Sequence, residues 1–221
     1  MPNMAAMKTG AARRLLQDRA YEELKGLIQG GTYPAGTFLS ERQLAGRLGM
    51  SKTPIKSALT RLDMEGFLAV SPQQGIVVRE PSIREIMDLF DIREALEGFV
   101  VRRMAGRLAP AQAARVRENL REQARAAKSG DVEAATRLDA EFHIMICEFL
   151  GNREISQALW RMREKLHRLI LGNFTRVPRR MGDSVREHAG IARAIFRGQG
   201  ELAAERIRKH LDVGRQLILG R

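Results

Sequence analysis

The stretch SKTPIKSALTRLDMEGF, residues 51–67, has the spacing of an amphipathic helix, yet it carries a proline near its start. Ser51 is a residue type that favours the N-cap position, so Pro54 falls within the first turn of the helix. A proline is tolerated there because the N–H groups of a first turn have no partner inside the helix. The proline is therefore compatible with a helix that begins at this serine.

The surface of this predicted helix is divided between two chemistries. Its apolar side is formed by Ile55, Leu59 and Leu62, and the rest of it carries Lys52, Thr53, Lys56 and Ser57. A shorter helix over ERQLAGRL precedes it, with Ser40 as the N-cap and Gly49 as the C-cap. Two helices joined by a tight turn, the second with cations on its open face, indicate a helix-turn-helix whose second helix enters the major groove of DNA.

The residues after this helix predict a wing. The segment FLAVSPQQGIVV, residues 67–78, reads as a strand, a turn and a strand directly after the predicted DNA-reading helix. An earlier helix is expected to end at Gly30 and Gly31. We therefore expect a winged helix-turn-helix domain over residues 12–79, preceded by a flexible N-terminal arm over residues 1–11. The alternative is a small α+β domain whose charged helix face is merely solvated.

The remaining two thirds of the chain predict an all-α bundle. Ser82 and Glu85 have the spacing of a capping box, which opens a helix. Further helices are expected at about 110–129, 131–150, 153–172, 182–198 and 200–219, with the longest break around Pro178. Breaks of these lengths connect antiparallel neighbours. The expected fold is therefore mainly α: a winged helix-turn-helix followed by an antiparallel helical bundle over residues 80–221.

Composition limits the environment and the partners of the protein. The chain has 221 residues and a net charge of +12, which attracts it to polyanions. It has no apolar run long enough to cross a membrane, and its start lacks the apolar stretch of a secretory signal. Cys147 is the only cysteine, so an internal disulfide cannot form. These features favour a cytoplasmic location and argue against a membrane partner.

The predicted bundle holds all four histidines of the sequence. Asp139 and His143 are four residues apart, so they share a helix face, and that face borders an apolar stripe. His188 and His210 are each in register with the apolar residues of their own helices. Three imidazoles and one carboxylate that point inward suit a divalent transition metal, with zinc or nickel favoured and manganese or iron as alternatives. Spacing alone leaves open that each histidine is a core residue satisfied by a hydrogen bond.

Two further residues of the bundle are expected to lie outside this site. His167 is beside Arg163 and off the main apolar stripe, so we expect it to be structural or exposed. Cys147 follows His143 by one turn, and a small buried thiol is favoured over a soft metal ligand.

These motifs together resemble the GntR family of bacterial transcription regulators, in its FadR-like branch with an all-helical FCD effector domain. The motifs are LSERQLAGRLGMSKTPIKSALTRLDMEGFL with the wing QQGIVV, DIREALEGFVVRRMA at residues 91–105, and Asp139-x3-His143 followed by His188 and His210. The resemblance implies a cytoplasmic homodimer that binds a pseudo-palindromic operator in double-stranded DNA. It also implies that the four candidate ligands form a metal site at the floor of an effector pocket.

The resemblance further assigns residues to DNA contact. They lie at the starts of the two helices, along the second helix and at the wing tip: Ser40, Glu41, Arg42, Ser51, Lys52, Thr53, Lys56, Arg61, Gln74 and Gly75. Lysine stands at positions 52 and 56, where the family usually has arginine. Since lysine is a point charge and arginine a rigid fork, a different reading of guanine is expected here.

The effector implied by the resemblance is a small organic acid. Its carboxylate would complete the coordination of the metal, and Arg93 corresponds to an arginine that in many family members faces the pocket. The alternative for Arg93 is a structural ion pair with Asp91, Glu94 or Glu97.

Two other functions fit parts of the sequence. A metal held by three histidines and an aspartate can activate water, as in a metal-dependent hydrolytic enzyme. We expect no enzyme, because no general base or nucleophile motif is recognisable near the four ligands. An effector-independent architectural DNA-binding protein is the second alternative, but it would have no need for an interior cluster of acid and histidine.

Overall fold

The computed structural model describes residues 4–71 and 75–220, which divide into two compact units. The first unit is Met1–Pro81 and the second is Ser82–Arg221. This division lies two residues after the domain boundary that the sequence predicts. Each unit has its own core of buried apolar side chains, and each is described separately below.

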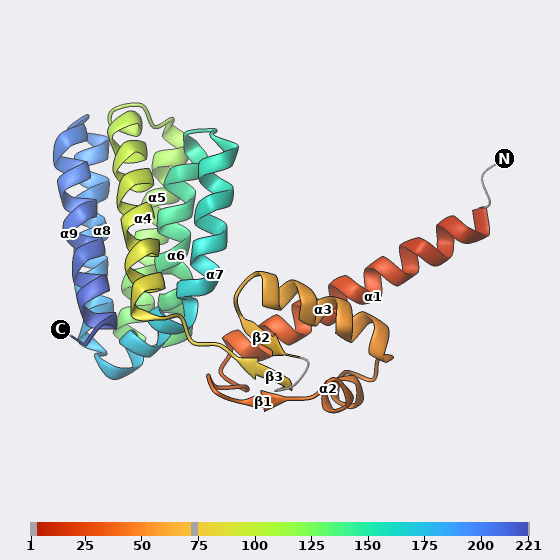
Figure 1. Cartoon of the computed structure of the whole chain (residues 1–221). Coiled ribbons are helices and arrows are strands. Elements are labelled where there is room, and N and C mark those ends of the chain that lie inside the picture. The colour runs from red at the N-terminus through yellow and green to blue at the C-terminus, as the bar shows by residue number, and fades with distance from the viewer. Residues whose placement is uncertain (1–3, 72–74, 221) are drawn as a thin grey trace. The chain divides into compact units, whose positions relative to one another are not determined.

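The first unit combines helices with a small sheet (Figure 1). Its elements are α1 (Met4–Gln29), β1 (Phe38–Leu39), α2 (Glu41–Leu48), α3 (Lys52–Met64), β2 (Leu68–Ser71) and β3 (Gly75–Val78). The sheet is antiparallel in the order β1-β3-β2, with Leu68 opposite Val78 and Leu39 opposite Ile76. The predicted winged helix-turn-helix is therefore confirmed. Strand β1 was not predicted, because two residues are too few to show an alternating pattern.

Helix α1 begins earlier than predicted, at Met4. A helix thus replaces the flexible arm that was expected over residues 4–11. The physical reason is that this segment contains alanine, methionine and lysine, which have high helix propensity, and no helix breaker other than Gly10.

The apolar side of α3 lies in the core of the first unit, as predicted. Ile55, Leu59 and Leu62 are each no more than 2% exposed. They pack with buried residues of α1, α2 and the sheet, among them Leu24, Ile28, Leu44, Leu68 and Val78. Because this side is buried, the cationic remainder of α3 is left on the surface of the unit.

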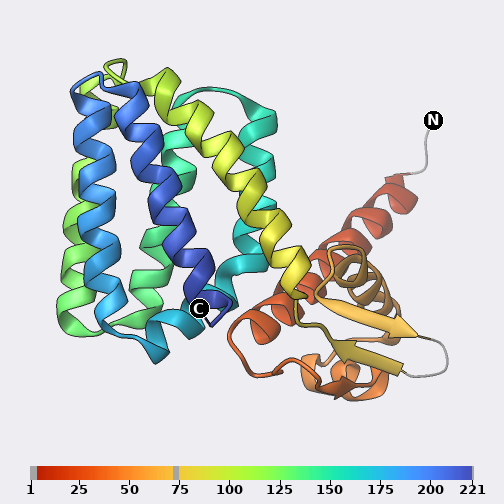
Figure 2. The same cartoon turned by 60° about the vertical axis from the view of Figure 1, so that its left-hand side comes forward.

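The second unit is a bundle of helices (Figure 2). Its elements are α4 (Ile83–Met104), α5 (Pro110–Ser129), α6 (Val132–Phe149), α7 (Arg153–Arg176), α8 (Arg179–Phe196) and α9 (Gly200–Ile218). The capping box that opens α4 is present: the Glu85 amide donates to Ser82 Oγ at 3.2 Å, and the Ser82 amide donates to Glu85 Oε2 at 2.8 Å. The all-α bundle is confirmed.

The break between α7 and α8 is shorter than the sequence predicted. Only Val177 and Pro178 separate the two helices, whereas a break of about nine residues was expected. Phe174 and Met181 on either side are buried in a common cluster, which favours helix up to the proline. This extension places Arg180 on a helix and turns it into the protein interior, where it is 5% exposed.

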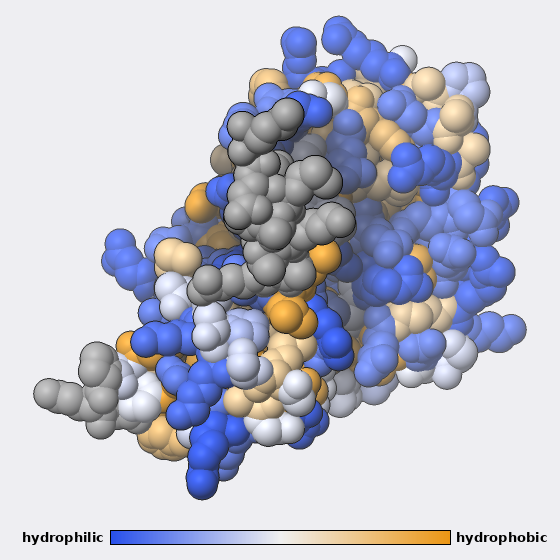
Figure 3. Space-filling model, turned by 90° about the vertical axis from the view of Figure 1, so that its right-hand side faces the viewer, coloured by the Kyte–Doolittle hydropathy of each residue, from blue (hydrophilic) through white to orange (hydrophobic). Residues whose placement is uncertain are grey.

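One face of the molecule is predominantly polar. Hydrophilic side chains prevail on the face shown in Figure 3, with apolar ones scattered among them. No helix within residues 4–71 and 75–220 combines the length and the apolar character needed to span a bilayer.

Candidate metal centre

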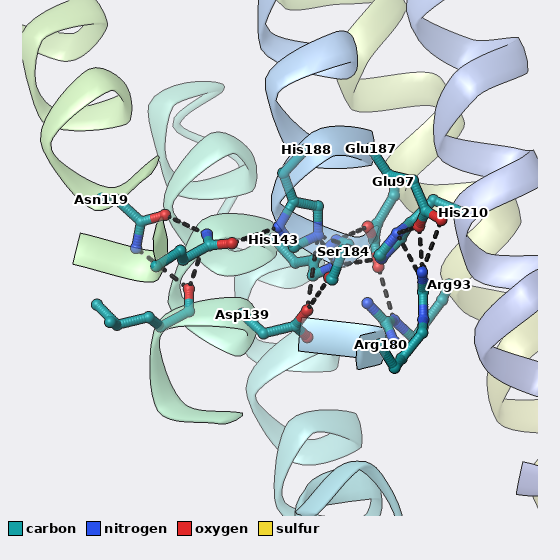
Figure 4. Close-up of polar contacts among 12 residues, drawn as sticks. Arg93, Glu97, Asn119, Asp139, His143, Arg180, Ser184, Glu187, His188 and His210 are labelled. Atoms are coloured by element: carbon teal, nitrogen blue, oxygen red, sulfur yellow. Dashed lines mark hydrogen bonds and ion pairs between the residues drawn. The ribbon is translucent and has the colours of Figure 1, made fainter. Parts of the chain in front are cut away.

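Three helices bring the four candidate ligands together in the interior of the bundle. Asp139 and His143 come from α6, His188 from α8 and His210 from α9. All four are buried, and His188 is 0% exposed. One ligand atom from each residue lies within 4.8 Å of the others, as Figure 4 shows. The structure thus unites the whole set of ligands that the sequence singled out.

The three imidazole rings meet through the same nitrogen. The Nε2 atoms of His143, His188 and His210 form a triangle in which each side is 3.2 Å. Two nitrogens that each bind one zinc ion at about 2.0–2.1 Å lie roughly 2.8–3.4 Å apart when the angle at the metal is between about 90° and 109°. The triangle therefore has the size that a single transition metal ion requires.

Hydrogen bonds at the far side of each ring decide which nitrogen carries the proton. His143 Nδ1 lies 2.6 Å from Glu97 Oε2, His188 Nδ1 lies 2.8 Å from Gln123 Oε1, and His210 Nδ1 lies 2.6 Å from Glu187 Oε2. Since each of these oxygens is an acceptor, each Nδ1 donates its proton and each Nε2 of a neutral ring keeps a lone pair. Three lone pairs that converge at 3.2 Å repel one another unless a cation lies between them. The donor set therefore fits a metal.

Aspartate completes the set from the side of α6. Asp139 Oδ1 accepts a hydrogen bond from Ser184 Oγ at 2.7 Å and lies 3.7 Å from His188 Nε2. The serine hydroxyl orients one carboxylate oxygen toward the three rings. Three nitrogens and one carboxylate oxygen are ligands that zinc, nickel, manganese and iron accept.

Ion pairs with two buried arginines hold the acceptors of two histidines. Arg93 Nε donates to Glu97 Oε1 at 2.7 Å, and both nitrogens of the Arg180 fork donate to Glu187 at 2.6 Å. Burial alone would raise the pKa of Glu97, but the Arg93 guanidinium and His143 lower it to about 2. Burial likewise acts to raise the pKa of Glu187, while hydrogen bonds from His210 and Arg180 bring it to about 2. Both acceptors are therefore carboxylates at neutral pH.

The acceptor of the third histidine is held by amides. Gln123 Nε2 donates to Asn119 Oδ1 at 2.6 Å, and Asn119 Nδ2 donates to the Leu138 carbonyl at 3.1 Å. These bonds fix the orientation of the Gln123 amide, so its oxygen faces His188. Sequence reasoning missed this pair, although Asn119 and Gln123 recur with Val116 and Ala126 on the buried side of α5, and that periodicity could have revealed them.

The same surroundings favour the neutral form of His188 and His210. Burial lowers the pKa of His188 well below its ordinary value, and the neighbouring His210 and His143 act in the same direction. Burial also lowers the pKa of His210, against an opposing hydrogen bond from Glu187. Neutral imidazole is the form that binds metal, so the site is ready for an ion at physiological pH.

A cavity opens beside Asp139 and His143. It is partly open to solvent, its empty space is about 390 Å³ when that open part is included, and Glu97, Asp139, His143 and Arg93 are among the residues that line it. Arg93 is 7% exposed and lines this cavity. It also forms the ion pair with Glu97 that was the alternative expectation for it. Arg93 also borders a second cavity of about 380 Å³, next to His210 and Arg180.

His167 and Cys147 lie outside the ligand set. His167 is half-buried and lines the first cavity. Helix α7 turns the side containing Leu159, Leu166 and Ile170 toward this cavity, and His167 lies on that side. Cys147 is 1% exposed and does not belong to the ligand cluster, in agreement with a buried thiol.

Two family models match the chain, one for each unit. Residues 16–78 match "Bacterial regulatory proteins, gntR family", and residues 88–213 match the FCD domain. The chain belongs to the GntR family of bacterial regulators. Its FCD domain agrees with the FadR-like branch that the motifs indicated.

Relatives and solved structures agree with this assignment. The chain is 25% identical over 193 residues to the HTH-type transcriptional regulator YdhC of Bacillus subtilis. The aligned region covers 87% of this chain and 86% of that protein. It is 25% identical over 178 residues to the repressor RspR of Escherichia coli, which covers 80% and 77%. The fold resembles that of E. coli McbR/YncC with a TM-score of 0.78 at 21% identity, over 93% of this chain and 97% of that one. The two family models identify this GntR-family protein as a transcriptional regulator.

The open face of α3 is where this GntR-family protein presents its predicted DNA contacts. Lys52, Thr53 and Lys56 are exposed there, as is Ser51 just before the helix. Ser51 occupies the N-cap position, but among the described residues its side chain makes no capping hydrogen bond. Ser40, by contrast, caps α2 by accepting from the Gln43 amide at 3.2 Å, and Glu41 and Arg42 open that helix.

Arg61 does not lie on this face. It follows Lys52 by nine residues, which places it about 180° away around a helix of 3.6 residues per turn. Its guanidinium carbon is 3.5 Å from the centroid of the Tyr21 ring, and its Nε donates to Glu65 at 3.2 Å. Arg61 therefore ties α3 to α1. At the wing tip, Gly75 has φ of 83°, which glycine adopts without strain, and Gln74 lies outside the described residues.

Proposed function

We propose that the protein is a ligand-responsive, cytoplasmic repressor or activator that binds a pseudo-palindromic DNA operator as a homodimer. In this proposal a divalent transition metal, zinc or nickel in the first place, is held by Asp139, His143, His188 and His210. A small organic acid binds beside it and changes the affinity for DNA. The observation that carries the proposal is the triangle of three Nε2 atoms, 3.2 Å apart, inside an FCD domain.

The metal site and the cavity together define where the acid would bind. When bound, the ion supplies a Lewis-acid position that a carboxylate oxygen can occupy. Arg93 lines the same cavity and carries a positive charge, only part of which is engaged by Glu97 through Nε. The remaining N–H groups of its guanidinium are suited to orient a carboxylate that also touches the metal.

DNA binding is assigned to the first unit. The exposed cations Lys52 and Lys56 lie 40° apart around α3, so both reach the same groove, and Thr53 lies beside them. The buried stripe of Ile55, Leu59 and Leu62 fixes the rotation of the helix about its axis. This rotation presents the cationic side to the major groove.

We assign the homodimer interface to the exposed side of α4. Ile92 and Phe99 are each 48% exposed, although they are large and apolar. They share one side of the helix with Asp88 and Arg103, within about 60° around its axis. If two copies of α4 pair antiparallel about a twofold axis between residues 95 and 96, each Ile92 meets Phe99 of the other copy and each Asp88 meets Arg103. Both contacts are complementary, as an isologous interface requires.

Helix α4 also links this surface to the metal centre. Its inner side carries Arg93 and Glu97, which hold His143, and its outer side carries Ile92 and Phe99. An acid that binds Arg93 therefore contacts α4, the helix through which the two copies are proposed to pair. A coupling free energy of about 1–3 kcal/mol between effector and operator would change DNA affinity by roughly 5- to 150-fold.

The proposal is tested by native mass spectrometry and metal analysis of protein purified without a histidine tag. We expect a dimer of the 24.8 kDa chain with one divalent ion per chain. Titration with organic acids should then change the affinity for the operator. A metal-free protein that gains no stability from zinc, nickel or manganese would remove the metal from the proposal and leave only the regulator.

A further inference from the structure

We infer that the cavity beside the metal centre contains a second anion-binding subsite, formed by Arg163 and His167 of α7, so that the effector is a short organic acid with two acidic groups. This inference rests on the proposed function, because it assumes that a first carboxylate binds at the metal and Arg93. It adds the chemical class of the effector and two residues that recognise it.

Both residues belong to one side of α7. Arg163 and His167 are four residues apart, so they are neighbours on the helix surface, and both line the cavity. Both are half-buried. Burial lowers the pKa of His167, the positive charge of Arg163 lowers it further, and Glu133 opposes them. Since they are neighbours on the helix and line the same cavity, the two side chains can act on one ligand.

The guanidinium of Arg163 is held without being neutralised. It lies 4.9 Å from the centroid of the Trp160 ring, which orients it by a cation–π contact. Within residues 4–71 and 75–220, Arg163 forms no ion pair with a carboxylate. The acidic residues of the same cavity, Glu97 and Asp139, are already engaged by Arg93 and by Ser184 beside the histidines. A cationic side chain that lines a cavity without a carboxylate partner is suited to a ligand anion.

Much of the wall of the cavity is apolar. Ala140, Ile144, Leu159, Leu166 and Ile170 line it, together with the hydroxyl of Thr136. A chain of a few methylene groups matches such a wall, because its burial is favourable by about 0.8 kcal/mol per CH₂. The cavity thus suits an acidic group at the metal end, a short hydrocarbon spacer, and a second acidic group at Arg163 and His167.

The test compares acids of equal chain length on the metal-loaded, full-length protein. Calorimetric titrations with glutarate and adipate are set against pentanoate and hexanoate, and 4-phosphonobutyrate is added to distinguish a second carboxylate from a phosphoryl group. We call acids with two acidic groups two-headed and acids with one acidic group one-headed. We expect at least one two-headed acid to bind ten times more tightly than its one-headed counterpart. A preference for the phosphonate supports the same subsite and names its preferred group.

Variants of Arg163 and His167 test whether these residues cause the preference for a second acidic group. Arg163→Gln should reduce the advantage of the two-headed acid to less than threefold while leaving binding of the one-headed acid unchanged, and His167→Gln should reduce it in part. Arg161→Gln removes the same charge from an exposed position of α7 and should preserve the full preference. Unchanged binding of the one-headed acid also shows that the Arg163 variant is folded.

Two negative outcomes are distinguishable. If one-headed acids bind and two-headed acids bind no more tightly, the second subsite is wrong and the proposed function stands. If neither kind of acid binds the metal-loaded protein, the effector site of the proposed function fails, and the second subsite fails with it.

Discussion

His143 and Glu97 are joined by a hydrogen bond of 2.6 Å between Nδ1 and Oε2, across 46 positions of the sequence. The bond connects α6, which carries two candidate ligands, to α4, which carries the proposed dimer surface. Glu97 is 2% exposed and is held in turn by Arg93. Glu97, which holds a candidate ligand, and the proposed dimer surface thus lie on two sides of one helix.

Loss of one ligand should abolish the response to metal. In His188→Ala the triangle of Nε2 atoms is broken, so addition of zinc or nickel should no longer raise the melting temperature. For wild-type protein, a metal concentration 100 times its dissociation constant adds about 2.7 kcal/mol of stability by mass action. His167→Ala is the control, since His167 lies outside the ligand cluster. An equal response to metal in both variants would show that the ion binds elsewhere.

Removal of the negative charge of Glu97, which holds the ligand His143, should weaken metal binding without abolishing it. Glu97→Gln keeps an acceptor oxygen for His143 but loses the carboxylate that polarises the ring, and we expect metal affinity to fall by about 10- to 100-fold. Competition with a chelator of known affinity measures the change. Glu94→Gln, on the same helix and outside the hydrogen bonds around the site, should leave affinity within twofold. If Glu97→Gln binds metal as tightly as wild type, the orientation of His143 has another origin.

Acid should destabilise the bundle and release the metal. The pKa values of His188 and His210 are lowered in the folded protein, so the unfolded chain binds more protons at mildly acidic pH. Stability should therefore decrease as the pH falls below about 6.5, the ordinary value of histidine. Metal affinity should decrease in the same direction because protons compete for Nε2. Melting temperatures measured between pH 8 and pH 5, with and without metal, test this prediction. A melting temperature that does not change with pH would contradict it.

The cationic face of α3 should determine operator affinity. Lys56→Ala is expected to weaken binding to the operator without changing the melting temperature, because the side chain is exposed. Lys128→Ala, which removes an equal charge from α5, should have little effect. Replacing both Lys52 and Lys56 by arginine should shift base preference, since a bidentate contact contributes about 1–3 kcal/mol of discrimination. A footprint and an affinity that survive Lys56→Ala would mean that another surface reads the DNA.

The exposed side of α4 should control the association of two chains. Phe99→Asp is expected to produce monomers at micromolar concentration, observed by analytical ultracentrifugation, because it introduces charge at the centre of the apolar patch. Asp88→Arg and Arg103→Asp should each weaken the dimer, and the double variant should recover part of the loss. Met64→Asp alters an equally apolar residue of the first unit that is 77% exposed, and it serves as the control. Dimers that persist in Phe99→Asp would exclude this face.

Much of the fold and the ligand set could be predicted from the sequence because both depend on local periodicity. Ile55, Leu59 and Leu62 mark the buried side of α3 by their spacing, and the position of Pro54 is explained by the chemistry of a first turn. Asp139 and His143 share a side because they are four residues apart. His188 and His210 follow the apolar stripes of their own helices, so each points inward whatever its neighbours are.

The tertiary structure alone decided which side chains meet across helices. The acceptors Glu97, Gln123 and Glu187 lie 46, 65 and 23 positions from the histidines they hold, and no local pattern connects them. Arg180 was expected in a loop, and only the packing of Phe174 and Met181 around Pro178 extends the helix and buries its guanidinium. The contact of Arg61 with Tyr21 of α1 and the position of His167 at the cavity also depend on how neighbouring helices pack. Helical periodicity sets the direction of a side chain relative to its own axis, whereas the rotation and packing of neighbouring helices set what that side chain touches.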